Sequence, residues 1–205
     1  MALHNRRVEF TEVVRRRRMV RAYDPSRPVP RAVIDELLGL ALHAPSAGFS
    51  QGWQFLVLES AADRSTFWAT IADGPPDTWL AGMRNAPVLI VAFSDKQAYL
   101  DRYAEPDKGW TDRDEARWPV PYWHIDTGMA SLLVLLGAVD RGLAGCFFGV
   151  PQTHWDALQK AFAVPPRLTP VGAISLGYRA PDRRSPSLRR GRRPLGDVVT
   201  YGSFR

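Results

Sequence analysis

The amino-acid sequence predicts an α+β fold, in which helices and strands occur in mixed order around one core. Four short apolar runs have the length of strands, and longer segments with helical periodicity lie between them. The chain has 205 residues, 45% of them hydrophobic and 11% aromatic, which is enough for a sizeable core. No internal repeat or low-complexity linker interrupts the sequence, so residues 1–205 are expected to form a single domain.

The clearest helix is expected over residues 31–44, RAVIDELLGLALHA, directly after the helix-breaking segment SRPVP. Its apolar residues recur at three- and four-residue spacing and form one stripe, made up of Val33, Ile34, Leu37, Leu38 and Ala41. Further helices are expected at 62–72, 77–84, 124–141 and 153–163, and strands at 55–59, 87–94, 145–150 and 169–178.

Two segments fall outside this pattern. Residues 95–123 are acidic and aromatic and are too long for an ordinary connection, which predicts a lid or an insertion. The aromatic rings of this segment could wall a flat apolar slot or simply pin it to the surface; they belong to Tyr99, Tyr103, Trp110, Trp118, Tyr122 and Trp123. Residues 179–205 are expected to form a C-terminal extension.

Several features argue against a membrane, secreted or metal-binding protein. The most apolar segment, 125–139, contains Asp126 and is shorter than the roughly 20 residues of a membrane span, and residues 1–10 lack the apolar run of a signal peptide. Cys146 is the only cysteine, so no internal disulfide or cysteine-based metal site is possible. No P-loop, Rossmann glycine fingerprint or zinc-ligand cluster is present. We therefore expect a cytoplasmic protein without a metal.

The net charge of +6 is concentrated at the two ends of the sequence. Residues 6–27 contain eight Arg and residues 179–193 contain seven, against four acidic residues in the two segments together. A nucleic-acid-binding surface usually spreads basic residues and aromatics along one face, whereas two separate arginine clusters can converge on one compact anion. The pattern favours a small anionic ligand over nucleic acid.

Five stretches occur in the order and spacing of the nitroreductase-like flavoprotein family, which the chain resembles from about residue 10 to 200. They are RRMVRAYDPSRPVP (17–30), APSAGFSQGWQFLVL (44–58), RNAPVLIVAF (84–93), GMASLLVLLGAVDRGLAGCFFG (128–149) and LGYRAPDRR with RRGRRPLGDVV (176–199). The resemblance implies a central, mainly antiparallel sheet flanked by helices, built as an intertwined homodimer. It also implies one FMN in each of two sites at the subunit interface, with NADH or NADPH as the reductant.

The stretch APSAGFSQGWQF (44–55) resembles the family's A-P-S-x-x-N-x-Q-P-W loop, which reaches across the dimer to the partner's flavin. In this loop small residues let the backbone approach the flat ring, Ser46 can hydrogen-bond its polar edge, and Trp53 is expected to anchor the loop in the core. Phe49 stands where Asn is common and Gly52 where Pro is, so Phe49 could line the acceptor pocket instead. The flavin contacts that the resemblance implies come from Pro45, Ser46, Ala47, Phe49 and Gln51.

The arginine clusters have a place in the same resemblance. Arg17, Arg18 and Arg21 match the N-terminal R-R-S-x-R motif that binds the FMN phosphate, with Met19 in place of the serine. Arg192 stands where the family supplies a second phosphate ligand, and Arg190 is an expected helper. Guanidinium groups suit this role because they bind phosphate bidentately. The remaining arginines of the clusters are expected to be surface charge, among them Arg15, Arg16, Arg183 and Arg184.

The stretch GLAGCFFGVP (142–151) resembles the family's strand and turn beside the flavin, which implies that a backbone N–H of Gly149 or Val150 donates to flavin N5. No side chain needs to perform acid–base catalysis, because the cofactor carries the hydride chemistry. Other polar side chains that could suggest catalysis are expected to be capping or core residues, namely Asp126, His124, His43, His154 and Cys146.

The expected function is transfer of hydride from NAD(P)H through FMN to a nitroaromatic, quinone or similar planar acceptor, in a ping-pong reaction. Two alternatives remain. The loop is also similar to that of the flavin-fragmenting dimethylbenzimidazole synthases, although Met19 replaces the acidic residue of their R-R-D-x-R motif. The second alternative is a non-catalytic protein that only binds a flavin or a deazaflavin.

Overall fold

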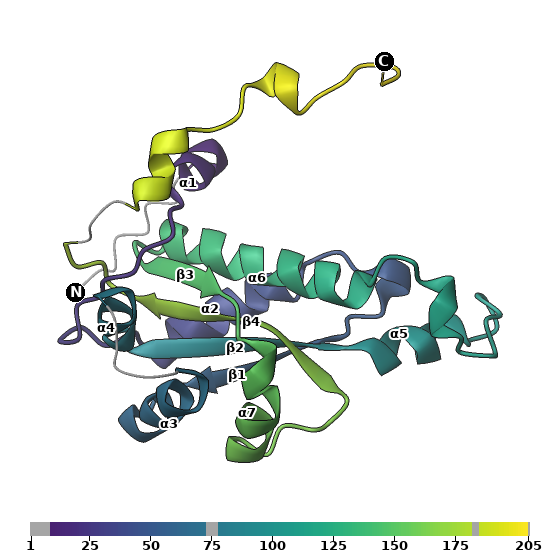
Figure 1. The fold of residues 1–205 in the computed structure, drawn as a ribbon, viewed down its shortest axis with the longest axis horizontal. Coiled ribbons are helices and arrows are strands. Elements are labelled where there is room, and N and C mark those ends of the chain that lie inside the picture. The colour runs from purple at the N-terminus through teal and green to yellow at the C-terminus, as the bar shows by residue number, and fades with distance from the viewer. Residues whose placement is uncertain (1–8, 73–77, 182–184, 205) are drawn as a thin grey trace.

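A four-stranded antiparallel sheet lies at the centre of the computed structural model, which describes residues 9–72, 78–181 and 185–204 (Figure 1). The strand order is β1-β2-β4-β3. The strands are β1 (Trp53–Leu58), β2 (Val88–Asp95), β3 (Ala144–Phe148) and β4 (Leu168–Gly177). The predicted α+β class, the antiparallel sheet and all four strands are therefore confirmed, with strand ends displaced by one or two residues.

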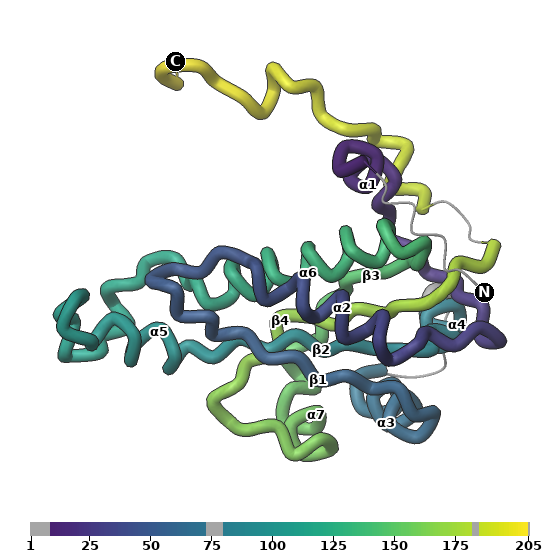
Figure 2. The backbone as a smooth tube through the Cα atoms, turned by 180° about the vertical axis from the view of Figure 1, so that it is seen from behind, coloured from purple at the N-terminus to yellow at the C-terminus, as the bar shows by residue number. Residues whose placement is uncertain are grey.

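Helices cover both faces of the sheet (Figures 1 and 2). One face carries α2 (Arg31–Ala41) and α6 (Tyr122–Asp140), and the other carries α3 (Ala61–Ile71), α4 (Thr78–Arg84) and α7 (Trp155–Ala161). Two helices that the sequence pattern did not predict, α1 (Phe10–Arg16) and α5 (Lys96–Tyr103), lie at opposite ends of the molecule. Single 3-10 turns are η1 (Ala47–Phe49), η2 (Glu115–Arg117), η3 (Gln152–His154), η4 (Pro186–Arg190) and η5 (Leu195–Asp197).

Strand β2 is buried along its whole length because both of its faces are covered. Successive side chains of a strand point to opposite faces. Leu89 and Val91 accordingly join the core beneath α3, α4 and α7, whereas Val88 and Ile90 join the core beneath α2 and α6.

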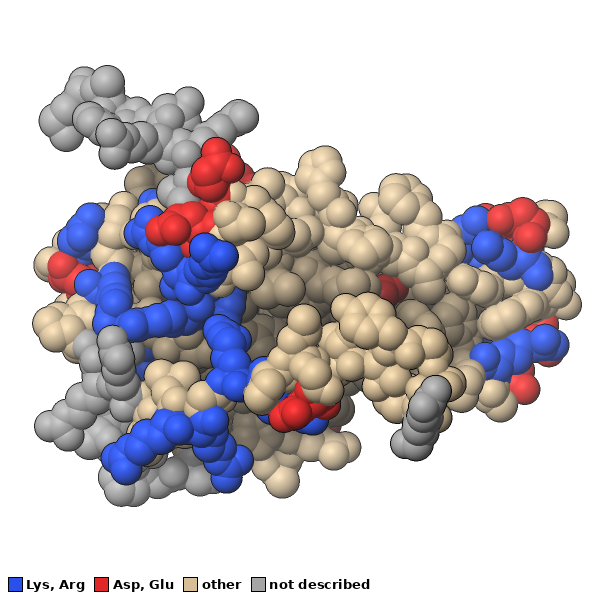
Figure 3. Space-filling model, turned by 90° about the horizontal axis from the view of Figure 1, so that it is seen from above, with Lys and Arg blue, Asp and Glu red and all other residues tan. Residues whose placement is uncertain are grey.

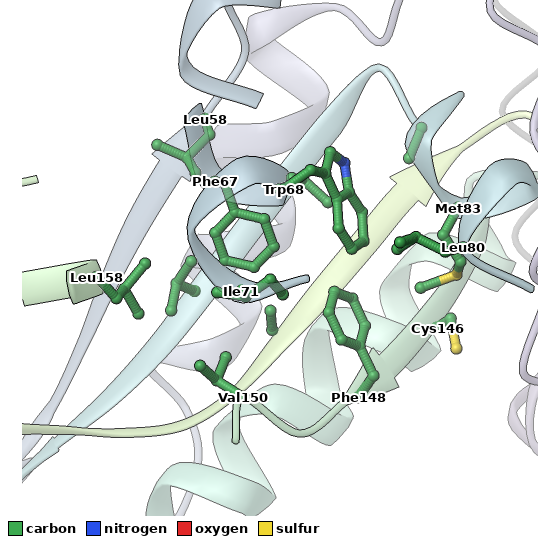
Figure 4. Packing of buried hydrophobic residues seen from close by; sticks show 14 of the residues in the cluster. Leu58, Phe67, Trp68, Ile71, Leu80, Met83, Cys146, Phe148, Val150 and Leu158 are labelled. Carbon is green, nitrogen blue, oxygen red and sulfur yellow. The ribbon is translucent and has the colours of Figure 1, made fainter. Parts of the chain in front are cut away.

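The first of these cores is rich in aromatic residues (Figure 4). Trp68 of α3 stacks on Phe148 of β3 with ring centroids 5.5 Å apart and planes 11° apart, and Phe67 meets Trp68 edge-on. Cys146 is 1% exposed within this cluster, which confirms the expectation that it is a core residue. The cluster fixes the end of β3, next to Gly149 and Val150, one of which is predicted to donate its backbone N–H to flavin N5.

Helix α6 is apolar on its outer side as well as its inner side. Its inner residues, such as Ala130 and Val134, pack against the sheet and α2, while Ile125 and Leu132 are 42% and 46% exposed. Within the described residues α6 is the one helix whose length and apolar composition would allow it to cross a membrane, but about half of it is buried in the protein. An apolar stripe on the surface of a packed helix indicates an interaction face.

The chain leaves the body of the protein after β4. The backbone of Arg179 forms an isolated antiparallel β-bridge with that of Tyr23, and the Ala180 N–H donates to the Ala22 carbonyl. Residues 185–204 then extend away past α1 (Figures 1 and 2). This C-terminal tail carries apolar side chains that are strongly exposed in the single chain, namely Leu188, Leu195, Val198, Tyr201 and Phe204.

Candidate functional site

Arginines from the two ends of the sequence meet around one cavity of about 530 Å³. The N-terminal segment contributes Arg17, Arg18 and Arg21, and the tail contributes Arg192. No acidic residue lines this cavity among the residues that the structure describes. Figure 3 shows the resulting concentration of Lys and Arg at one end of the molecule. We call this space the phosphate cavity, since its donor set suits a phosphate group.

The N-terminal arginines are held in place by the sheet. The segment that follows α1 runs along the edge of β3, where Met19 forms a parallel bridge with Gly145 and the Val20 N–H donates to the Gly145 carbonyl at 3.2 Å. On its other side, α4 approaches closely at Gly82, where a Cβ would stand 2.2 Å from the Arg21 carbonyl oxygen. The backbone that carries the arginines is therefore fixed by β3 and α4.

Two further arginines of the clusters lie differently with respect to this cavity. Arg190, the expected helper of Arg192, does not line the phosphate cavity. Arg15, which was expected to be surface charge, is exposed and also lines this cavity. Arg183 and Arg184 lie outside the described residues.

The loop that is predicted from the sequence to contact the flavin lies at the end of the molecule opposite the phosphate cavity. It contains η1, which packs against α5 and the first turns of α6, whereas α1 lies at the other end of α6 (Figures 1 and 2). Between Asp126, which contacts the loop, and Val139, near the arginines, α6 rises roughly 20 Å. One chain therefore does not bring its own loop onto its own phosphate cavity.

Asp126 anchors the loop to the fold. Its carboxylate Oδ2 accepts hydrogen bonds from the Ala47 N–H at 2.8 Å and from the Tyr99 hydroxyl at 2.8 Å, and Asp126 is only 1% exposed. Burial, reinforced by this hydrogen bond to Asp126, raises the pKa of Tyr99 far above its usual value, so the hydroxyl remains a donor. On the surface side, Arg102 Nε donates to the Gly48 carbonyl at 2.8 Å.

The backbone of the loop is strained. Gly48, Phe49 and Gln51 have φ of 60°, 58° and 51°, a left-handed conformation that is costly for the last two. The Phe49 side chain is 73% exposed, and the Pro45 side chain is also exposed. Ser46 Oγ accepts from the Gln51 N–H at 3.0 Å, which leaves its own hydroxyl proton to donate outward. Strain and apolar exposure in one rigid loop indicate a binding element.

Gly52, which departs from the family pattern, is required by packing. A Cβ at this position would lie 2.5 Å from the Tyr99 ring and 2.7 Å from the Asp95 carbonyl oxygen. The Gly52 carbonyl in turn accepts from the Asp95 N–H at 2.7 Å. Trp53, which follows it, is 7% exposed and packs in the core beneath α2 and α6, as expected of a loop anchor.

Gly149 and Val150 follow the end of β3. The Val150 side chain lies in the core and its carbonyl accepts from Trp155 Nε1 at 3.0 Å, whereas Gly149 is exposed and a Cβ there would meet open space. Neither backbone N–H donates a hydrogen bond to another residue within the described ranges. Both remain able to donate to a ligand.

The titratable side chains near the loop do not form a catalytic dyad. His124 Nδ1 lies 2.8 Å from Ser94 Oγ, and Trp123 Nε1 donates to His124 Nε2 at 3.2 Å, which requires the proton to sit on Nδ1. Burial lowers the pKa of His124, with a smaller contribution from Lys96, so the ring is held neutral. In that tautomer His124 donates to Ser94 and cannot accept its proton.

The aromatic residues of segment 95–123 pack chiefly against one another. Trp118 lies at the centre, with ring contacts to Tyr99, Tyr103, Trp110 and Trp123 at centroid distances of 5.9, 4.6, 5.6 and 6.0 Å. Tyr122 also touches Trp118 but is 44% exposed. Most of these rings therefore pin the segment to the fold, which was one of the two interpretations of the sequence.

We expect Tyr99→Phe to destabilise the protein by about 1–3 kcal/mol, because the buried Asp126 carboxylate loses one of its two donors. The free energy of unfolding in urea measures this. Tyr103→Phe is the matched control: within the described residues the Tyr103 hydroxyl makes no hydrogen bond, and the change should stay within about 0.5 kcal/mol. Equal stabilities for the two variants would show that Asp126 does not depend on Tyr99.

The chain is similar in sequence and fold to several known proteins. The chain is 27% identical over 177 residues to a Methanothermobacter thermautotrophicus protein named "Putative NADH dehydrogenase/NAD(P)H nitroreductase", covering 85% of this chain and 79% of that one. It is 28% identical to the 4-nitrobenzoate reductase of a Nocardioides species, covering 94% and 89%. A structure of a "putative nitroreductase in complex with FMN" from Exiguobacterium sibiricum superposes with a TM-score of 0.72 at 24% identity, covering 95% and 98%.

The family assignment follows from the sequence together with the fold. Residues 14–178 match the model of the nitroreductase family, a span that includes the N-terminal arginines, the anchored loop and all four strands. The solved structure supports the same fold over nearly the whole chain. This chain belongs to the nitroreductase family.

Proposed function

We propose that the protein is an FMN-dependent oxidoreductase that takes hydride from NADH or NADPH and passes electrons to a nitroaromatic, a quinone or a similar planar acceptor. The observation that carries the proposal is the phosphate cavity, a single space lined by Arg17, Arg18, Arg21 and Arg192. The names of the relatives, which include NAD(P)H nitroreductase and 4-nitrobenzoate reductase, support the reaction class.

The residues present fit FMN. Its terminal phosphate carries a charge of roughly −2, which the guanidinium groups can bind through charge-assisted hydrogen bonds. The ring would lie against the strained loop, where small residues at Pro45, Ser46 and Ala47 admit a flat surface. Bound FMN supplies the hydride chemistry, so the protein needs to provide binding and orientation only.

The site is proposed to be shared between two subunits. The loop and the phosphate cavity lie at opposite ends of one chain, and closed twofold symmetry lets each subunit complete the other's site. Two apolar surfaces support a homodimer, the outer stripe of α6 with Ile125 and Leu132, and the tail with Leu195 and Tyr201. Both would otherwise face water.

Each part of the chain has a distinct role in this site. The arginines bind and orient the ligand from one subunit, while the loop, held by Asp126, would cover the ring from the other and exclude water. The N–H of Gly149 or Val150 is available to donate to the reactive edge of the ring. The buried cysteine and the nicotinamide reductant both suit the cytoplasm, where we expect the protein to act.

The reaction class is tested by adding NADH or NADPH, under anaerobic conditions, to the purified protein with its flavin bound. We expect the flavin absorbance to bleach and to return on addition of a quinone, with parallel double-reciprocal lines because the reductant and the acceptor use one pocket in turn. Absorbance that does not change with either nucleotide would indicate a flavin-binding protein without this activity.

The exposed Phe49 side chain is proposed to face the acceptor. Phe49→Asn should change the ratio of kcat/KM for a quinone and a nitroaromatic by about tenfold while FMN affinity changes by less than about threefold, since the ring side chain offers stacking rather than a cofactor contact. Leu42→Asn, at another exposed apolar residue outside the loop, is the control. Loss of FMN with an unchanged acceptor ranking would place Phe49 in the cofactor site.

A further inference from the structure

A second basic cavity lies beside the phosphate cavity, at the turn between α6 and β3. Its volume is about 460 Å³, within the range of roughly 300–1,000 Å³ typical of small-molecule sites. Four arginines line it, Arg15, Arg16, Arg18 and Arg179. Arg15 and Arg18 also line the phosphate cavity, so the two cavities are neighbours, whereas Arg16 and Arg179 belong to this one alone.

The charges of this second cavity are poorly compensated. No acidic side chain lines it in the described part of the chain, and Arg15, Arg18 and Arg179 form no ion pair there. Arg16 has one partner, Glu12, at 4.0 Å and with both side chains more than half exposed, a pair of little energetic value. The C-terminal end of α6 adds only a partial negative charge of roughly one half, which four guanidinium groups outweigh.

The floor of the cavity is apolar. Val20, Leu143 and Ala144 are 5%, 6% and 7% exposed, and Val139 of α6 also contributes. Gly142 forms the turn with φ of 72°, and a Cβ there would meet open space. A cationic rim over an apolar floor suits a ligand that carries a phosphate on a flat or apolar body, as a nucleotide does.

We propose that Arg15, Arg16, Arg18 and Arg179 form a second anion site, which binds the phosphate of a nucleotide and for which AMP is the probe. The nucleotide has two possible sources. It is either the AMP half of a flavin dinucleotide whose other phosphate occupies the phosphate cavity, or a separate nucleotide that binds beside FMN. The neighbouring flavin site rests on the proposed function, but the second anion site does not require a flavin.

The test is equilibrium dialysis of AMP against the purified protein, with and without FMN, at constant ionic strength. We expect wild-type protein to bind one AMP per chain and to bind adenosine at least about tenfold more weakly, since adenosine lacks the charged group. The Arg16→Ala, Arg179→Ala double variant should lose AMP affinity by at least about tenfold yet retain FMN, because neither side chain lines the phosphate cavity.

A matched control separates the site from general electrostatics. The Arg31→Ala, Arg117→Ala double variant removes the same number of positive charges from surface ion pairs with Asp35, Glu59 and Asp112, away from this cavity, and should bind AMP like wild type. Three results would overturn the proposal. They are an equal loss of AMP affinity in both double variants, an affinity of the wild type for AMP no higher than for adenosine, and an unchanged AMP affinity in the Arg16→Ala, Arg179→Ala variant.

The two sources give different results with the flavins. If the AMP half of a dinucleotide is the natural ligand, FAD binds the apoprotein more tightly than FMN, this advantage disappears in the Arg16→Ala, Arg179→Ala variant, and FAD displaces AMP. If the nucleotide is separate, FAD has no advantage and AMP binds equally well with FMN in place. If the wild-type protein binds AMP but neither FMN nor FAD, the proposed function is refuted, whereas the second anion site is not.

Discussion

The Arg21→Ala, Arg192→Ala double variant is expected to purify without FMN. The two arginines come from opposite ends of the sequence and line one cavity. A hydrogen bond to a charged group is worth about 1.5–3 kcal/mol, so removal of both should cost about 3–6 kcal/mol, or about 10²–10⁴-fold in the dissociation constant. Flavin absorbance per chain after gel filtration, and fluorescence titration of the apoprotein with FMN, measure the loss.

The Arg31→Ala, Arg117→Ala variant again serves as the charge-matched control and should keep its flavin, because neither side chain lines the phosphate cavity. Circular dichroism establishes that both proteins are folded. Full flavin content in the Arg21, Arg192 variant would show that the phosphate lies elsewhere.

A second large loss of FMN affinity is expected from a substitution in the loop, at the end of the molecule opposite the phosphate cavity. Pro45→Trp should reduce FMN affinity at least about 100-fold, because a bulky ring would occupy the space into which the loop is proposed to admit the flavin. Pro45 is exposed, so the single chain can accommodate the larger side chain. His43→Trp, at an exposed residue just before the loop, is the control and should bind FMN normally. An FMN affinity for Pro45→Trp equal to that of wild type would remove the loop from the site.

The core of the fold could be predicted from local patterns. Strand β2 is buried on both faces, so its sequence is a continuous apolar run, and such a run predicts a strand over 87–94. Ile34, Leu37 and Ala41 form the buried side of α2, so they recur with the spacing that predicts a helix. Helices α1 and α5 were not predicted. Both are short, and α5 is largely polar, so neither has the periodic apolar stripe that a sequence pattern requires.

The site could be predicted only in part. The N-terminal and C-terminal arginines were named from the family motif, and the structure brings four of them to one cavity. The support of the loop could not be found in this way, because Asp126, Tyr99 and Ala47 are far apart in sequence and meet only through the packing of α6 and α5. The second cavity was missed for a similar reason, since Arg179 reaches Arg15 and Arg16 only after β4 has paired with β3.

We propose that each flavin site combines the phosphate cavity of one subunit with the loop of its partner. A purified heterodimer, made by co-expressing differently tagged Arg21→Ala, Arg192→Ala and Pro45→Trp chains, tests it most directly. Each parent homodimer should be free of flavin, whereas the heterodimer pairs the intact cavity of one chain with the intact loop of the other, and both defects fall in the second site. We predict one FMN per heterodimer, with NAD(P)H reducing that flavin. A heterodimer as free of flavin as its parents would contradict the account, because it would mean that the loop and the arginines of the same chain form the site.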